Sequence, residues 1–211
     1  FCAEMSQRGF LVFSFEYPLA PEASFPQILK DLMTGIGNAR AYFETYDGDE
    51  SCIYMTGTSA GASLCVYLAA MLGSPELAEA FEIVPAKLYI RALGLVSGMY
   101  YTTKLDSIGI FLPSYIYGKQ WKKSSFYPYI DPENEAIIRH LPPSFLVTAY
   151  GDMLRNYSRQ YAEAMKRGGA ICHLEDFEAG KKLPHAFSTT FPEMPESRRA
   201  NERMVEFLLK H

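Results

Sequence analysis

The chain has 211 residues, of which 48% are hydrophobic and 21% charged; this composition supplies one globular domain and excludes a disordered or collagen-like chain. The formal net charge is −4 and no basic run exceeds two residues, so we expect no nucleic-acid partner. No stretch approaches the roughly 18 apolar residues that span a membrane, so a membrane partner is not expected either.

Apolar runs alternate with helical patterns along the chain, which is typical of an α/β fold with a mostly parallel sheet and helices on both faces. The predicted strands, in chain order, are 10–15, 52–56, 88–96, 144–150 and 170–177. The predicted helices are 26–46, 60–72, 155–167 and 196–210. The helix at 155–167 is amphipathic and is followed by two glycines, a common stop signal.

A long interruption between the third and fourth predicted strands, residues 99–143, breaks this alternation. Its segment 111–129 carries seven aromatic residues in 19 positions, and an insertion this long in a compact domain is usually functional. The interruption divides one predicted domain into a first core part (1–98), the insertion with its return segment (99–143) and a second core part (144–211).

Residues 57–61, Gly-Thr-Ser-Ala-Gly, match the pattern G-x-S-x-G between a predicted strand and a predicted helix. A nucleophile elbow requires this context, and its turn is so tight that we expect both glycines to be needed. The start of the helix behind Ser59 would offer the N–H of Ala60 and a favourable dipole to a developing oxyanion. A Ser/Gly turn without catalysis is the alternative that this motif alone leaves open.

A serine nucleophile needs a base, and the base needs an orienting acid; in this fold the chain order is serine, acid, histidine. Of the four histidines, only His185 lies in a loop after the last predicted strand. Asp152 follows the fourth predicted strand, at the edge where parallel strands deliver side chains to a site. Asp152 could instead cap the following helix, and one residue can fill both roles.

Four segments carry motifs in a fixed order: E-Y-P-L-A-P-E at 16–22 followed by F-P at 25–26, G-T-S-A-G at 57–61, G-D-M-L-R at 151–155 and P-H-A-F at 184–187. Together they resemble the hormone-sensitive-lipase-like branch of the α/β-hydrolase superfamily, whose segments read D-Y-R-L-A-P-E with F-P, G-[DE]-S-A-G, D-x-L-R and H-G-F. The resemblance spans residues 16–187. It implies an α/β-hydrolase fold with Ser59 as nucleophile, His185 as base and Asp152 as the partner of the base.

By the same resemblance, the insertion from residue 99 to about residue 129 is part of a cap over an acyl pocket. Its aromatic residues either line that pocket or pack the cap against the sheet, and the sequence favours neither. Two departures from the family pattern stand out. Thr58 occupies the position of the usual acid in the elbow, and the H-G-G-G segment that supplies further oxyanion donors is absent.

We therefore expect that the chain, which begins at Phe1 rather than Met, is a fragment of a longer protein, with the N-terminal strands absent. In the family, the strand that carries H-G-G-G lies between those expected at 10–15 and 52–56, so its absence would leave a gap in the sheet. A rearranged sheet is the alternative. No signal peptide is visible, which favours the cytoplasm, although a missing segment could have carried one.

The function that these residues favour is serine-dependent hydrolysis of a small, short-acyl carboxylic ester, without a cofactor. An amide or peptide hydrolase of the same fold and a non-catalytic protein that binds a small ligand are the alternatives. No His, Cys or Asp cluster has metal-ligand spacing, and no phosphate-binding glycine loop is present. The four cysteines include no C-x-x-C pair, so we expect reduced, mostly buried thiols. The oligomeric state is not readable from the sequence.

Overall fold

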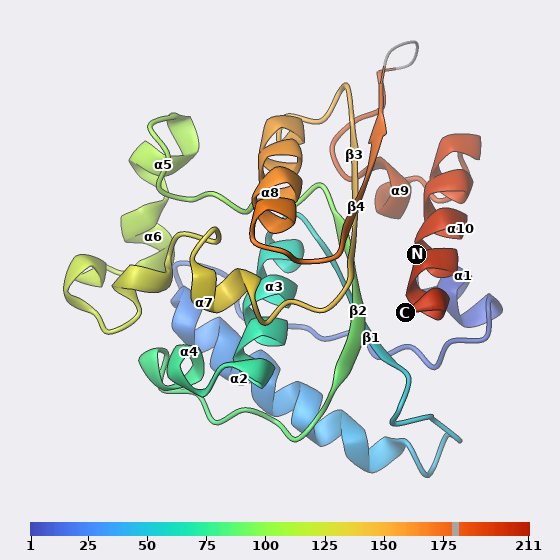
Figure 1. Ribbon diagram of the computed structural model, residues 1–211, viewed down its shortest axis with the longest axis horizontal. Coiled ribbons are helices and arrows are strands. Elements are labelled where there is room, and N and C mark those ends of the chain that lie inside the picture. Colours follow the sequence, from blue (N-terminus) through green and yellow to red (C-terminus); the bar gives the residue numbers. More distant parts are fainter. Residues whose placement is uncertain (179–181) are drawn as a thin grey trace.

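The computed structural model describes residues 1–178 and 182–211. Within these residues four strands form one parallel sheet in the order β1-β2-β3-β4, so each strand pairs with the next one along the chain. Their bounds are β1 Ile53–Thr58, β2 Ile90–Val96, β3 Ser144–Ala149 and β4 Cys172–Phe177. Helices cover both faces of the sheet (Figure 1), as the alternating pattern predicts.

On one side of the sheet, α3 Ala60–Gly73 and α8 Arg155–Arg167 pack on the strands, and α2 Phe25–Ala39, α4 Pro75–Ala80 and α7 Glu135–Ile138 pack on α3 (Figure 1). On the opposite side lie α1 Cys2–Gln7, α9 Phe187–Thr190 and α10 Pro195–Lys210. Crossovers through α3 and α8 return the chain in the same direction, which makes the strands parallel and brings all their carboxyl ends to one edge.

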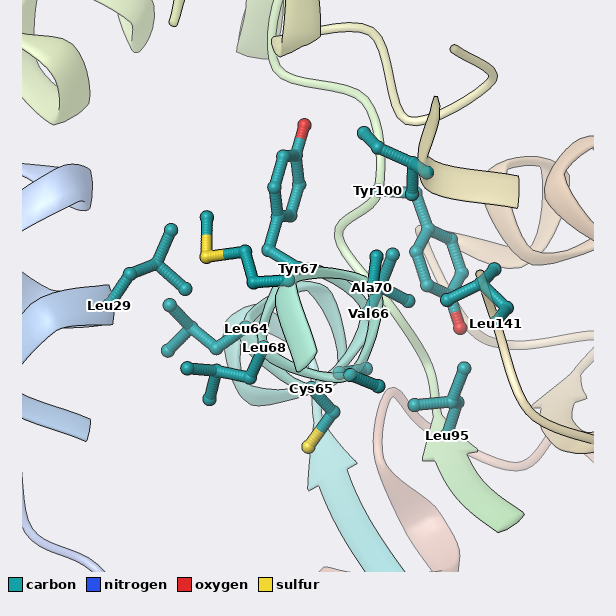
Figure 2. Packing of buried hydrophobic residues seen from close by; sticks show 14 of the residues in the cluster. Leu29, Leu64, Cys65, Val66, Tyr67, Leu68, Ala70, Leu95, Tyr100 and Leu141 are labelled. Atoms are coloured by element: carbon teal, nitrogen blue, oxygen red, sulfur yellow. The ribbon is translucent and has the colours of Figure 1, made fainter. Parts of the chain in front are cut away.

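Helix α3 lies at the centre of the larger core. Every residue from Ala62 to Met71 is buried, in accord with a helix that is apolar on all sides. Figure 2 shows its side chains meeting Leu29 of α2 on one side and Leu95 of β2 and Leu141 on the other. Each fully buried leucine contributes about 1.5–3 kcal/mol relative to an exposed one, so this helix is firmly held. A second, smaller cluster under α10 packs the opposite face of the sheet.

The insertion between β2 and β3 contains α5 Ser107–Phe111, α6 Pro113–Tyr117, two 3₁₀ turns (η2 Trp121–Lys123 and η3 Tyr127–Tyr129) and α7. Some of its aromatic rings pack, but against helical segments rather than the sheet. The ring of Tyr117 lies 5.5 Å from that of Phe25, and Phe126 stacks on Phe81 at 5.2 Å. Phe111 and Tyr115 instead expose most of their surface. Part of this segment therefore packs, but on helical neighbours and not on the sheet as expected.

The strand expected at 10–15 is wrong: this stretch has no regular secondary structure. A strand is stable only when its backbone groups pair with a neighbour, and β1, the edge strand of the described sheet, pairs with β2 alone. Phe10 merely touches the ring of Tyr54 edge-on at 5.9 Å, and Leu11, Val12 and Phe15 stay exposed. The run is apolar, as its sequence shows, but an apolar sequence does not reveal whether a neighbouring strand is present to accept its backbone hydrogen bonds.

Two smaller expectations also need correction. The helix predicted to reach residue 46 ends as α2 at Ala39 and continues only as the 3₁₀ turn η1, Arg40–Tyr42. The four cysteines are free, as expected, but Cys65 alone is buried and Cys2 is exposed. Burial raises the pKa of the Cys65 thiol to about 12.

Candidate active site

Ser59 lies in a sharp turn between the end of β1 and the start of α3. Its backbone has φ 56° and ψ −116°, a conformation that costs a non-glycine residue of order 1–3 kcal/mol and that clusters at functional sites. The Ser59 N–H donates to Val96 O at 2.9 Å, which fastens the turn to the end of β2. The sequence prediction of an elbow at this position agrees with this geometry.

The two glycines of the elbow differ. A Cβ on Gly57 would lie 2.3 Å from Gly61 O, so this position excludes every side chain. A Cβ on Gly61 would meet nothing within 4 Å among the described residues. The expected steric need for both glycines is therefore correct for Gly57 and wrong for Gly61 in this structure.

Asp152 follows β3 and its side chain is fully buried. The carboxylate accepts three hydrogen bonds: from His185 Nδ1 at 2.7 Å, from Leu154 N at 2.9 Å and from Thr148 Oγ1 at 3.0 Å. A buried carboxylate is tolerated only when its lone pairs are satisfied in this way. The bond from Leu154 N orders the turn before α8. The N-cap of α8 is Leu154, so the alternative that Asp152 caps this helix is wrong, while its contact with His185 is present.

His185 lies in the loop between β4 and α9, with 29% of its side chain exposed. Because its Nδ1–H points to Asp152, its Nε2 is left to face a second group. The other histidines lie elsewhere: His173 stacks on Phe145, His140 bonds to Ala136 O, and His211 packs on Phe207. The choice of His185 from its loop position agrees with these contacts.

The structure brings Asp152 and His185 into contact, but among the hydrogen bonds of the described residues none joins the side chains of Ser59 and His185. Their backbones are tied through the segment that follows β2. Met99 N–H donates to Ser59 O at 3.1 Å, and Ala186 N–H donates to Ser97 Oγ at 3.0 Å. The serine and the histidine therefore lie on adjoining loops at the carboxyl edge of the sheet.

Several supporting residues escaped the sequence analysis. Gly151 allows the histidine segment to approach, since a Cβ there would lie 2.3 Å from Leu183 O. Arg155 forms a two-pronged ion pair with Asp176 of β4, at 2.8 and 3.0 Å, which fixes the start of α8. Gly151 and Arg155 belong to the G-D-M-L-R motif, so the sequence could have identified them as supporting residues. Thr148 and Ser97 belong to no motif, and the sequence could not have identified them.

Ala60, the first residue of α3, lies behind Ser59. The first N–H groups of a helix have no acceptor within that helix, which makes Ala60 N–H a candidate donor to an anion beside Ser59. Among the described residues, no group of three His, Cys, Asp or Glu side chains is arranged to hold a metal ion. No helix in the described ranges is long and apolar enough to cross a membrane.

With this geometry in place, comparison with known proteins defines the class. Residues 1–189 match the profile of a family described as having the alpha/beta hydrolase fold, and the chain belongs to this family. This match confirms the resemblance to the α/β-hydrolase superfamily that the four motifs indicated. Two relatives are a probable isoprenylcysteine alpha-carbonyl methylesterase of Arabidopsis thaliana and the carboxylesterase NlhH of Mycobacterium tuberculosis. The first is 26% identical over 79% of this chain and 37% of its own length, and the second 27% identical over 79% and 54%.

Solved structures with the same fold are also esterases. Esterase B from Lactobacillus rhamnosis superposes on 98% of this chain and 68% of its own, with a TM-score of 0.87 and 20% sequence identity. An esterase from Pyrobaculum calidifontis covers 92% of this chain and 63% of its own, with a TM-score of 0.70 and 20% identity. The chain spans about half the length of the curated relatives that it matches.

Proposed function

We propose that the protein is a serine-dependent carboxylic ester hydrolase, with Ser59 as nucleophile, His185 as general base and acid, and Asp152 as the partner of His185. The observation that carries this proposal is the 2.7 Å contact from His185 Nδ1 to a fully buried Asp152. That contact lies one loop away from a serine held at positive φ in front of a helix.

In the proposed reaction, Ser59 Oγ attacks the ester carbonyl carbon while His185 Nε2 takes the hydroxyl proton. Asp152 holds the imidazole in the tautomer with hydrogen on Nδ1 and stabilises its cation. The tetrahedral intermediate expels the alcohol, to which His185 returns the proton. A water then attacks the acyl-serine with His185 again as base, and the acid leaves with Ser59 restored.

The developing oxyanion would accept a hydrogen bond from Ala60 N–H, at the amino end of α3. Removal of a single donor from such a site typically lowers turnover 10²–10³-fold, so this N–H would contribute substantially to the rate.

For the substrate, we propose a small ester with a short acyl group. Esterase B, which shares this fold, has been solved with a C4-C4 tributyrin phosphonate inhibitor, a mimic of a short-chain ester. The insertion between β2 and β3 is proposed as the cap over the acyl group, with residues 1–98 and 144–211 forming the hydrolase core. Turnover of matched ester and amide substrates would separate an esterase from an amide hydrolase.

A ligand-binding protein without catalysis is the second candidate, and the missing hydrogen bond between Ser59 and His185 is the observation in its favour. Catalytic hydrogen bonds are often long before substrate binds, so geometry alone does not decide between the two. The reactivity of Ser59 distinguishes the hydrolase from the binding protein, because a serine without an operating base is inert to organophosphorus reagents.

The deciding experiment is intact-mass labelling with a small fluorophosphonate. The parent chain should gain a single adduct, and Ser59→Ala should gain none. Ser114→Ala, which alters an exposed serine of α6, is the matched control and should label like the parent. A folded parent that gains no adduct would refute the hydrolase and leave the binding protein.

A further inference from the structure

Ala186, the residue after His185, is held in the left-handed region, with φ 58° and ψ 28°. Glycine enters this region freely, whereas a residue with a Cβ is disfavoured there by about 1–2 kcal/mol. The family pattern H-G-F has glycine at this place, and this chain has alanine. The conformation of the histidine loop must therefore be imposed by contacts outside Ala186.

Both backbone polar groups of Ala186 are held. Its N–H donates to Ser97 Oγ at 3.0 Å. Its carbonyl oxygen accepts from Thr189 Oγ1 at 3.1 Å and from the N–H groups of Thr189 and Thr190 at 3.1 and 3.0 Å. Ala186 is 8% exposed, so water cannot readily replace these partners. The loop is thus gripped from two sides at the residue next to the imidazole.

Ser97 is a rigid support for the first of these bonds. It follows the last residue of β2, is fully buried, and has itself a positive φ of 51°. Its N–H donates to Val147 O at 2.8 Å, which continues the pairing between β2 and β3 beyond the end of the strand. A buried side chain at the end of a central strand moves little, so Ser97 fixes the position of the histidine loop relative to the end of β2.

Thr189 connects the second grip to the nucleophile elbow. The hydroxyl of Thr58, the residue before Ser59, donates to Thr189 Oγ1 at 3.3 Å. Thr189 in turn donates to Ala186 O. Two hydroxyls therefore span the distance from the residue before the serine to the residue after the histidine. Thr58 replaces the acid usual in this elbow, and its hydroxyl can donate to Thr189, which an ionised carboxylate cannot do. The hydroxyl of Thr189 both accepts this bond and donates to Ala186 O.

We propose that Ser97 and Thr189 are positioning residues that hold His185 at its working place between Asp152 and Ser59, with Thr58 linking Thr189 to the elbow. The proposal rests on the proposed function, in which His185 must reach both neighbours. Neither residue touches the substrate; each acts through the backbone of Ala186. A misplacement of about 1 Å can cost 10²-fold in rate, so a loop held by a few bonds is sensitive to the loss of one.

The test compares Ser97→Ala with the parent chain by two readouts. The first is the rate of fluorophosphonate labelling at Ser59. The second is the NMR signal of the His185 Nδ1 proton, which reports the contact with Asp152 and needs no catalysis. We expect labelling to slow about 10–100-fold and the Nδ1 proton to exchange faster with water. Ser158→Ala is the matched control, since Ser158 is also buried and its hydroxyl has no partner among the described residues.

A rescue distinguishes positioning from a general loss of stability. In Ser97→Ala/Ala186→Gly, the glycine adopts the left-handed conformation without cost, so part of the labelling rate and the Nδ1 signal should return. Thr189→Val removes the hydroxyl bond to Ala186 O and the link to Thr58 with little change of volume, and it leaves the two backbone N–H bonds to Ala186 O in place. This variant decides the question if Ser97→Ala does not fold. Its labelling should also slow.

The outcomes separate the two proposals. A parent that labels, with Ser97→Ala and Thr189→Val labelling at the parent rate, would overturn the positioning role and leave the hydrolase standing. Slow labelling without any recovery in the glycine double variant would also overturn it. A parent that does not label refutes the hydrolase, and the Nδ1 signal then tests the positioning role alone. Loss of that signal in Ser97→Ala supports the positioning role, and an unchanged signal overturns it.

Discussion

The segment 10–15 and strand β3 have similar apolar sequences, yet they differ completely in the folded chain. β3 has a neighbour on each side, all six of its residues are buried, and it delivers Asp152 to the site. The segment 10–15 pairs with no strand of the described sheet, and four of its six residues are exposed. The difference shows that hydrophobic residues become a strand only where partners satisfy the backbone, and that the candidate site depends on the paired part.

The same contrast separates the two ends of the candidate site. Asp152 and His185 follow β3 and β4 and are joined by short hydrogen bonds around a buried carboxylate. Ser59 follows β1, the edge strand of the described sheet. Its links to the histidine loop are indirect and run through the segment after β2 and through the hydroxyls of Thr58 and Thr189. We therefore expect the histidine–aspartate half of the site to resist perturbation more than the serine half.

Asp152→Asn is the change with the largest expected effect. The asparagine amide would donate to Nδ1 and force the imidazole hydrogen onto Nε2, so His185 could no longer take a proton from Ser59. The corresponding change in a serine protease lowers turnover about 10⁴-fold while the geometry survives. We expect a comparable loss in the rate of fluorophosphonate labelling, measured on protein whose circular dichroism matches the parent. Labelling within tenfold of the parent would show that Asp152 does not orient the base.

Leu146→Ala tests the paired part of the comparison directly. Leu146 is fully buried at the centre of β3, and truncation of such a leucine typically costs about 2–5 kcal/mol. We expect a loss of that size in the free energy of unfolding, measured by urea denaturation. A loss below about 1 kcal/mol would mean that β3 is not the rigid element that the packing indicates.

The sequence predicted the paired part well and the unpaired part poorly, for one physical reason. The sequence predicts β2, β3, β4, α3 and α8 within two residues of their observed bounds. Each of these elements has its own pattern of apolar residues, and that pattern is enough to indicate it. Asp152 was chosen as a candidate because the carboxyl ends of parallel strands meet at one edge, and the structure brings it into contact with His185. The triad as a whole stays a prediction. Pairing across the sheet is not local, so nothing in residues 10–15 could show whether a neighbouring strand would pair with them.

The supporting residues of the site were missed for a related reason. Serine and threonine at strand ends are common, and only the fold reveals that Ser97 meets Ala186 and that Thr148 meets Asp152. Their partners lie 89 and 4 residues away along the chain. Even the near pair gives no signal in the sequence, because its contact depends on the turn after β3.

Phe15→Ser has the smallest expected effect and tests the unpaired part. Phe15 is 38% exposed and belongs to no element, so its loss should change the free energy of unfolding by about 0.5 kcal/mol or less. The amides of residues 10–15 should exchange with solvent far faster than those of β3, because no ladder protects them. If Phe15→Ser instead destabilises as much as Leu146→Ala, or the two segments exchange alike, then this stretch pairs in solution. Residues 10–15 and β3 would then not differ in pairing, and the serine half of the site would have no reason to be more easily perturbed than the histidine–aspartate half.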